Sequence, residues 1–251
     1  MRSGLIAFLL FALAAVAVPA RAGEDRSQNG AFETAEATGV WHDAARGRDV
    51  PYKITYAPGA PGPRPIVIFS HGLGGNRDAA VFLMRHLASW GYVAVNLQHP
   101  GSDESIWRGK DDPVGAIREW FKDRRNLAET TQARFGDLSC AIDELARMAA
   151  SDPTFKGRLN LDRIGMSGHS FGAISTLAAA GQMMGPKAFE RSFAEPRIRA
   201  GIAYSPSPPM RREDFAHVYG AIRIPLFHMT GAEAGGPVGD RFPAEGRQTP
   251  F

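Results

Sequence analysis

A sharp turn between a strand and a helix is the feature that most constrains this chain. The segment Gly168-His169-Ser170-Phe171-Gly172 joins an apolar run at 163–166, typical of a buried strand, to a small-residue helix predicted from Ala173 to about Gly181. The flanking glycines let the strand and the helix pack too closely for a Cβ, and the turn holds the serine in a strained conformation. Its hydroxyl then lies above a sheet, near the positive end of the helix dipole. We therefore interpret Ser170 as a nucleophile; the alternative is a loop serine beside a packing turn.

Strands and helices alternate along the rest of the chain. Apolar residues alternate with polar ones at 50–56, as in a half-buried strand, and a helix with one apolar face follows Asp78, which can cap it. Further strands are indicated by short apolar runs at 66–69, 92–95, 198–204 and 224–229, and a further helix by helical spacing at 137–150. This alternation predicts an α/β fold with one domain, built on a mostly parallel, doubly wound sheet with right-handed crossovers.

A glycine-rich loop follows an earlier buried strand. In Ser70-His71-Gly72-Leu73-Gly74-Gly75, backbone N–H groups can point at an oxygen that becomes negative during acyl transfer. We predict an oxyanion hole made by the N–H groups of Leu73 and of Phe171, the residue directly after the nucleophile. The alternative is a loop that cradles phosphate, but no Lys-Ser/Thr pair follows the glycines as it does in a Walker motif.

The long loop from Gln98 to Pro113 leaves the carboxyl end of a predicted central strand, which is where ligands bind in open α/β sheets. Its length and position favour a rim or lid over a pocket rather than a plain connection. Together with the glycine-rich loop, it supplies the predicted substrate-binding residues His71, His99 and Trp107. Its acidic side chains are expected to disfavour anionic ligands.

The N-terminal residues have the pattern of an export signal. A basic start, an apolar run at 5–18 and a small-x-small site at 20–22 predict a cleaved signal peptide over 1–22. The apolar run is short for a membrane span, which needs roughly 20 residues. Residues 23–47 are predicted to form a polar leader with at most one short strand, and the main domain to cover 48–251. We expect the protein in the periplasm or outside the cell, without a stable membrane anchor.

Charge and cysteine content exclude several other classes of protein. The sequence has 29 basic and 26 acidic residues, and cleavage of the signal peptide would remove two of the basic ones, Arg2 and Arg21. The mature chain is therefore near neutral and lacks the excess of positive charge that is typical of proteins that bind nucleic acid. The single cysteine, Cys140, excludes a disulfide within the chain and a multi-cysteine zinc site. The sequence indicates no metal, no organic cofactor and no protein partner.

Four segments occur in an order that is found in one family of enzymes. They are 69–75, His99-Pro100-Gly101-Ser102, Arg163-Ile164-Gly165 with 168–172, and Met229-Thr230-Gly231. Over residues 48–251 the chain resembles the α/β-hydrolases described as predicted dienelactone hydrolases, which are related to platelet-activating-factor acetylhydrolases. The resemblance implies a serine, an acid and a histidine in that chain order, and carboxylic esters as substrates.

The chain departs from this pattern at the acid and at the base. The aspartate position of the family falls on Ala234, so the adjacent Glu233 is the candidate acid and Asp240 a weaker alternative. The base is expected after the acid, but no histidine follows residue 231, and His217 and His228 both precede the acid. We expect either a domain that is incomplete at its C-terminus or a natural pseudoenzyme.

The sequence therefore predicts an exported serine hydrolase that cleaves carboxylic esters, with short neutral esters as the expected substrates, through an acyl-enzyme on Ser170. The cysteine nucleophile of true dienelactone hydrolases does not apply, because Cys140 lies outside the turn. The alternative is a catalytically inactive protein of the same fold, which binds an ester-sized ligand and lacks the acid and the base of the triad.

Overall fold

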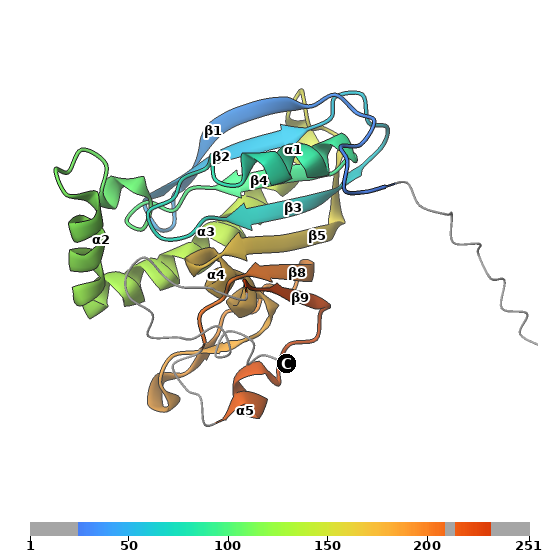
Figure 1. The fold of residues 1–251 in the computed structure, drawn as a ribbon. Coiled ribbons are helices and arrows are strands. Elements are labelled where there is room, and N and C mark those ends of the chain that lie inside the picture. The colour runs from blue at the N-terminus through green and yellow to red at the C-terminus, as the bar shows by residue number, and fades with distance from the viewer. Residues whose placement is uncertain (1–24, 209–213, 232–251) are drawn as a thin grey trace, which may run out of the picture.

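A single seven-stranded sheet forms the centre of the molecule (Figure 1). The computed structural model describes residues 25–208 and 214–231. The strand order is β1-β2-β4-β3-β5-β8-β9. The strands are β1 (Ala35–Asp43), β2 (Arg48–Tyr56), β3 (Arg64–Ser70), β4 (Val93–Leu97), β5 (Leu159–His169), β8 (Ile198–Tyr204) and β9 (Leu226–Met229). β2 is antiparallel to both of its neighbours, and all other pairs are parallel, which confirms the predicted mostly parallel sheet.

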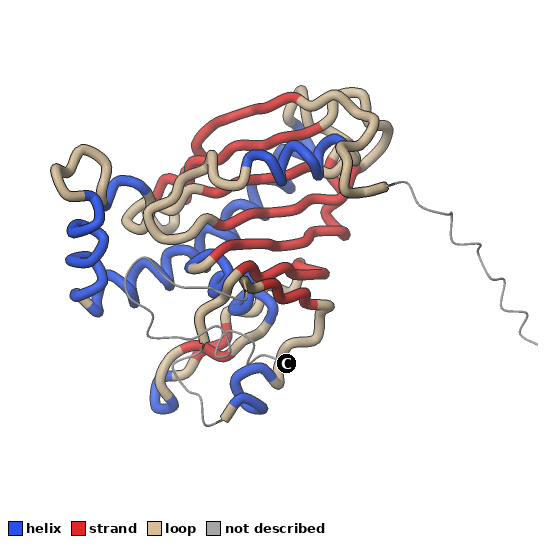
Figure 2. Tube along the Cα trace, in the orientation of Figure 1, coloured by secondary structure: helices blue, strands red, loops and turns tan. Residues whose placement is uncertain are grey.

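Helices cover both faces of this sheet (Figure 2). The helix α1 (Val81–Ser89) packs on β2 and β4, while α3 (Arg124–Ser151) and α4 (Phe171–Ala180) contact each other on the opposite face. The other elements are α2 (Pro113–Lys122), α5 (Phe215–Tyr219), a small hairpin of β6 (Met183–Met184) and β7 (Arg191–Ser192), and short 3-10 turns at Glu104–Ile106 and Lys187–Phe189. The arrangement is doubly wound, as predicted.

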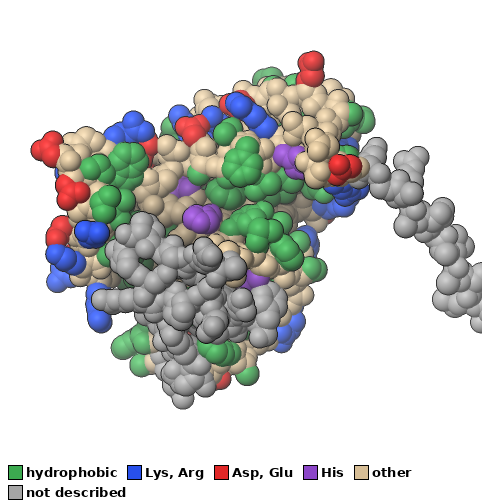
Figure 3. Space-filling model, in the orientation of Figure 1, with side chains coloured by type: hydrophobic (Ala, Val, Ile, Leu, Met, Phe, Trp, Pro, Cys, Tyr) green, Lys and Arg blue, Asp and Glu red, His purple; other side chains and the backbone are tan. Residues whose placement is uncertain are grey.

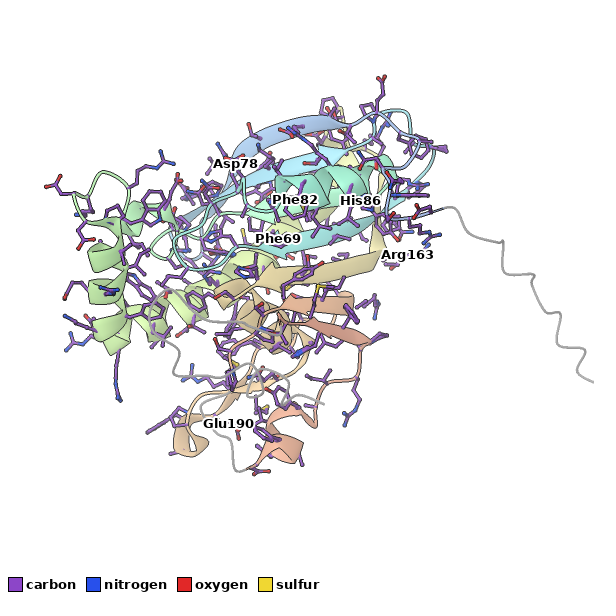
Figure 4. All side chains as sticks on the ribbon, in the orientation of Figure 1. Phe69, Asp78, Phe82, His86, Arg163 and Glu190 are labelled. Atoms are coloured by element: carbon purple, nitrogen blue, oxygen red, sulfur yellow. The ribbon has the colours of Figure 1, made fainter. Side chains whose placement is uncertain are left out.

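The hydrophobic core is divided by the sheet into two parts. Successive side chains of a strand point to opposite faces, so Ile68 of β3 joins the larger cluster beneath α3, whereas Phe69 joins the smaller cluster beneath α1. Both side chains are buried, and Figure 4 shows Phe69 on β3 beneath α1. Burial on both faces explains why β3 has a continuous apolar run rather than an alternating pattern.

The N-terminal part of the sheet differs from the sequence prediction. Residues 35–43, assigned to a polar leader, form the nine-residue strand β1, which pairs with β2 along its whole length. β1 lies at the edge of the sheet, and its exposed positions alternate with partly buried ones, so its sequence is polar although it is a regular strand. The predicted signal peptide at 1–22 lies outside the described residues. No helix within the described ranges has the length and apolar composition needed to cross a bilayer.

Two helices also differ from the prediction. The sequence did not predict α2, and α3 begins at Arg124 instead of near Asp137. The first ten residues of α3 are exposed or only partly buried, and the buried face that follows begins with the polar Arg134 and Asp137, so the usual helical spacing of apolar residues is missing from this half. The predicted cap of α1 is wrong: the residue before the helix is Ala80, at a φ of 53°, and Asp78 instead pairs with Lys53.

We predict that Leu145→Ala lowers the free energy of unfolding by about 2–5 kcal/mol, because Leu145 is fully buried between α3 and the sheet and its truncation leaves a cavity. The matched control is Phe82→Ala. Phe82 is 76% exposed on the outer side of α1, where Figure 4 labels it and Figure 3 shows apolar side chains. Truncation of this exposed side chain is therefore expected to lower the free energy of unfolding by at most about 0.5 kcal/mol. Chemical denaturation of both variants measures the difference; equal effects would contradict the described core.

Candidate active site

The turn between β5 and α4 places Ser170 in a strained backbone conformation. Ser170 has φ 53° and ψ −112°, a combination that costs a non-glycine residue of order 1–3 kcal/mol. Its N–H donates to the carbonyl oxygen of Tyr204 at the end of β8, at 2.9 Å, which anchors the turn to the sheet. Such strain persists only where the surroundings enforce it and is typical of functional sites. The predicted strand–turn–helix around Ser170 is confirmed, with α4 beginning at Phe171.

Two glycines allow this turn because backbone atoms occupy the space of their missing side chains. A Cβ on Gly168 would lie 2.3 Å from the carbonyl oxygen of Gly172. A Cβ on Gly172 would lie 1.9 Å from the carbonyl oxygen of Ser70, the last residue of β3. Both distances are far below van der Waals contact, so neither position admits a side chain without a backbone shift. The second contact also brings the end of β3 directly against the turn.

The glycine-rich loop lies beside Ser170. A Cβ on Gly72 would be 3.5 Å from the Cβ of Ser170, so the loop and the serine are in van der Waals range. Among the described residues, the N–H groups of Leu73 and Phe171 donate to no protein acceptor. Two unused N–H groups beside the partly buried Ser170 could stabilise an oxyanion.

A chain of buried hydrogen bonds lies beneath this loop. His99, just after β4, places Nε2 at 2.9 Å from the Ser70 hydroxyl and Nδ1 at 2.9 Å from a carboxylate oxygen of Asp137 in α3. Since the carboxylate only accepts, the proton sits on Nδ1, and Nε2 accepts from the Ser70 hydroxyl. Asp137 also accepts from Arg48 at 2.7 Å and is 3.0 Å from Arg46. Sequence reasoning missed Ser70 and Asp137 as members of the site.

Arg134 has the largest fully buried side chain among the described residues, and it completes the network. It donates from Nη1 to the carbonyl oxygen of His71 at 2.7 Å and to the Ser70 hydroxyl at 3.2 Å. Its Nε donates to the hydroxyl of Ser102 at 2.9 Å, and its guanidinium lies 4.2 Å from the ring centroid of Phe171. The signal that could have identified it is the pair of charges at 134 and 137, which lie three residues apart on the face of α3 that buries Leu138.

The two histidines of the site are held neutral. Burial, followed by the charge of Arg134, lowers the pKa of His99 to about 4 and the pKa of His71 well below its usual value. For Asp137, burial acts to raise the pKa, but hydrogen bonds from His99 and Arg48 outweigh it and lower the pKa to about 2. Burial lowers the pKa of Arg134 to about 9, so it stays protonated at neutral pH.

The loop at 98–113 lies against the glycine-rich loop, as its predicted role as a rim requires. The indole N–H of Trp107 donates to the carbonyl oxygen of Gly74 at 2.6 Å, and the N–H of Gly74 donates to the carbonyl oxygen of Ser102 at 2.9 Å. Beyond the loop, the ring of Trp120 in α2 lies 6.4 Å from the ring of Phe171. The loop and α2 therefore border the region of Ser170, on the side of the glycine-rich loop.

The structure brings Ser170, Phe171 and Leu73 together, but it gives the predicted substrate-binding residues a different setting. His71 is completely buried and His99 is 1% exposed, and both side chains are hydrogen-bonded within the protein. Only Trp107 is half-buried at the rim. The substrate-binding role of the three residues stays a prediction. The candidate acids Glu233 and Asp240 lie outside the described residues, as does Ala234.

Two further histidines, His217 and His228, lie in α5 and β9. His217 in α5 is 2.7 Å from Glu190. His228 lies within β9, as expected, and burial lowers its pKa. Among the described residues, no side chain is hydrogen-bonded to the hydroxyl of Ser170, and no group of three His, Cys, Asp or Glu side chains could hold a metal ion. Cys140 is buried in α3, where burial raises the pKa of its thiol.

Known proteins are similar to this chain in sequence and in fold. The model of the family "Platelet-activating factor acetylhydrolase, isoform II" matches residues 50–132. A platelet-activating factor acetylhydrolase from Cavia porcellus is 26% identical over 186 residues. These residues are 65% of this chain and 39% of that protein, so the match spans well under half of the relative.

A solved structure extends the likeness in fold. A crystal structure from Klebsiella pneumoniae that carries the name dienelactone hydrolase superposes with a TM-score of 0.54 at 18% identity, over 86% of this chain and 79% of that one. The chain has an α/β-hydrolase fold, and in sequence it is similar to platelet-activating-factor acetylhydrolases. The resemblance inferred from the four sequence segments is thus confirmed. In this α/β-hydrolase fold, the matched residues 50–132 include the glycine-rich loop and the rim, while Ser170 lies beyond them.

We predict that Gly172→Ala lowers the free energy of unfolding by about 3 kcal/mol or more, since the new methyl group would overlap the carbonyl oxygen of Ser70. Gly165→Ala, seven residues earlier and within β5, is the matched control. Its Cβ would find its nearest neighbour at 3.7 Å, an ordinary contact, so the change should stay within about 1 kcal/mol. Equilibrium denaturation of the two variants checks the result, and equal stability would argue against the close approach.

We also predict that the protein loses stability as the pH falls from 6.5 towards 4. In this window the unfolded chain protonates a histidine at its ordinary pKa of 6.5, whereas His99, with a pKa of about 4, stays neutral when folded. The unfolded state then binds more protons, and each such histidine contributes a slope of up to about 1.4 kcal/mol per pH unit. Denaturant titrations at pH 7, 6 and 5 measure this dependence of the free energy of unfolding on pH. Constant stability over this range would contradict a neutral buried His99.

Proposed function

We propose that this protein is a serine hydrolase that cleaves carboxylic esters through an acyl-enzyme on Ser170. The observation that carries the proposal is the strained Ser170, held between β5 and α4 with two unused N–H groups beside it. Strain at a serine with this placement is typical of a nucleophile elbow. The similarity to platelet-activating-factor acetylhydrolases and to a dienelactone hydrolase supports ester chemistry.

The reaction would proceed in two acyl transfers. The Ser170 oxygen attacks the ester carbonyl carbon while its proton passes to a general base, and the carbonyl oxygen becomes an oxyanion that accepts from the N–H groups of Leu73 and Phe171. The carbon–oxygen bond to the alcohol then breaks, and the alcohol leaves with the proton. Water attacks the acyl-enzyme in the same way, which releases the acid and restores the serine. No metal or organic cofactor takes part in this scheme.

The acid and the base of the triad would be expected after β9. β9 ends beside the turn, because the N–H of Ser205 donates to the carbonyl oxygen of Met229 at 2.7 Å and Tyr204 accepts from Ser170. The residues after β9, including the candidate acid Glu233, therefore follow a strand that ends near the nucleophile. Since the sequence contains no histidine beyond residue 231, we expect the 251-residue chain to hydrolyse activated aryl esters slowly or not at all.

Short neutral esters are the proposed substrates, and the loop at 98–113 forms the rim of their site. The rim contributes Trp107 beside Gly74. Of its acidic residues, Asp103 is buried and Glu104 is paired with Arg108, so the proposed disfavour of anionic ligands rests on the remaining acids of the loop, Asp111 and Asp112. We further propose that the protein is exported by the predicted signal peptide and acts in the periplasm or outside the cell. The relative from Cavia porcellus matches over less than half of its own length, so its substrate is not carried over.

The alternative function is ester binding without turnover. It is favoured by the absence of a hydrogen-bonded base at Ser170 among the described residues. A binding protein would keep the rim and the loop and would hold an ester without forming an acyl intermediate.

A fluorophosphonate probe tests the proposal. We expect the protein as its native gene encodes it to be labelled on Ser170, with the modified peptide identified by mass spectrometry, and Ser170→Ala to abolish labelling. The control is Ser175→Ala, which removes a buried hydroxyl five residues later in α4 and should leave labelling intact. Equal labelling of Ser170→Ala and the parent protein would exclude Ser170 as the nucleophile. Ester binding without any labelling would support the binding protein.

A further inference from the structure

We infer that Arg134 is a positioning residue for the oxyanion hole, acting with the buried chain Ser70–His99–Asp137 to hold the glycine-rich loop and Phe171 against Ser170. The inference rests on the proposed function, and it adds Arg134 and Asp137, which lie outside the four sequence segments that carry the family resemblance. It explains why a helix on the face of the sheet buries an arginine and an aspartate beneath a loop.

The chain Ser70–His99–Asp137 has the connectivity of a serine triad, but its burial excludes a direct role in catalysis. Ser70 and Asp137 are completely buried and His99 is 1% exposed, so no ester can reach the Ser70 hydroxyl. That hydroxyl also accepts from Arg134 while it donates to His99. Every polar atom of the chain is thereby occupied within the protein. The chain links the ends of β3 and β4 to α3.

Arg134 connects this chain to both segments that carry the proposed oxyanion donors. One nitrogen of its guanidinium binds the backbone of the glycine-rich loop at the His71 carbonyl, at 2.7 Å. The face of the guanidinium lies 4.2 Å from the ring centroid of Phe171, the first residue of α4. Its Nε binds Ser102 at 2.9 Å, and the carbonyl oxygen of Ser102 in turn accepts from Gly74. The side chain of Arg134 therefore contacts the glycine-rich loop directly at His71 and through Ser102 at Gly74, and it contacts the turn after Ser170 at Phe171.

His71 transmits this restraint to the donor N–H itself. Its Nδ1 donates to the carbonyl oxygen of Gly72 at 2.6 Å, and its Nε2 accepts from the N–H of His99 at 3.1 Å. The Gly72 carbonyl and the Leu73 N–H belong to the same planar peptide group, so holding the oxygen fixes the direction of the N–H. The N–H of Gly75 binds the same oxygen at 3.1 Å. This arrangement aims the Leu73 N–H before any substrate is present, which is the preorganisation that oxyanion stabilisation requires.

The positive charge of Arg134 is not neutralised by a carboxylate in direct contact within the described ranges. Among the described side chains, Arg134 makes no direct ion pair, whereas Asp137 is paired with Arg48 and Arg46. Asp103 and Asp137 act on the guanidinium only at longer range. A buried positive charge without a contacting carboxylate lies behind the two donors, where negative charge would develop on the substrate oxygen. Arg134 would thus add an electrostatic contribution to its positioning role.

Variants of Arg134 test the inference. In the protein as its native gene encodes it, the form used for the probe experiment, we expect Arg134→Lys and Arg134→Met to lower kcat for p-nitrophenyl acetate by about 100-fold, as removal of an oxyanion donor does. KM is expected to change less than about threefold. Hydrogen exchange of the amides at 71–75 should become faster, and exchange in β1 and β2 should not change. Arg134→Lys keeps the charge, so it is the variant to use if Arg134→Met does not fold.

Two controls separate positioning from general destabilisation. Arg125→Met removes an exposed arginine from the first turn of the same helix and should leave kcat and exchange unchanged. Leu145→Ala destabilises the domain from α3 without touching the loop, so kcat should be retained below its melting temperature. Parent-like kcat and parent-like exchange at 71–75 in both Arg134 variants would overturn the inference. If the parent protein neither hydrolyses the ester nor labels at Ser170, the proposed function fails, and the exchange measurement alone decides the positioning role.

Discussion

The contact between the backbone of Gly172 and the carbonyl oxygen of Ser70 is the constraint on which the rest of the site depends. It presses the first turn of α4 against the end of β3, in a space that no side chain could share. Because β3 runs directly into the glycine-rich loop, this one approach brings the loop beside Ser170. The strain in Ser170 follows from the same geometry, since the chain must reverse from strand to helix within one residue.

This close approach leaves the loop without the regular backbone hydrogen bonds of a strand, and the polar network supplies the missing partners. A buried charge is costly unless hydrogen bonds or ion pairs replace the hydration that it loses. Arg134 meets this condition through two hydroxyls and a carbonyl, and Asp137 through His99, Arg48 and Arg46. The network therefore ties α3 to the loops after β3 and β4, and it does so from the face of the sheet opposite α1.

The rim and the network act on the glycine-rich loop from different sides. Trp107 holds the Gly74 carbonyl from the exposed side, and Arg134 holds the His71 carbonyl from the buried side. Changes in substrate preference can then arise in the rim without disturbing the donors. In such a fold the surface loops can differ in sequence while the buried residues beneath the site stay in place. One scaffold can then accept different substrates.

The sequence by itself determined the parallel sheet, the turn at Ser170 and the glycine-rich loop, because each is encoded by adjacent residues: apolar runs, small residues and glycines whose spacing sets the local backbone. It also carried the family resemblance in four short segments. It did not reveal β1, α2 or the polar first half of α3, where the local pattern of apolar residues is weak. Nor did it reveal the network, because Ser70, His99, Arg134 and Asp137 are separated by up to 67 positions and no local pattern connects them. Only the tertiary structure decided that these four meet, because crossover connections bring the ends of β3 and β4 and the middle of α3 to one buried point, where a polar group must find a partner.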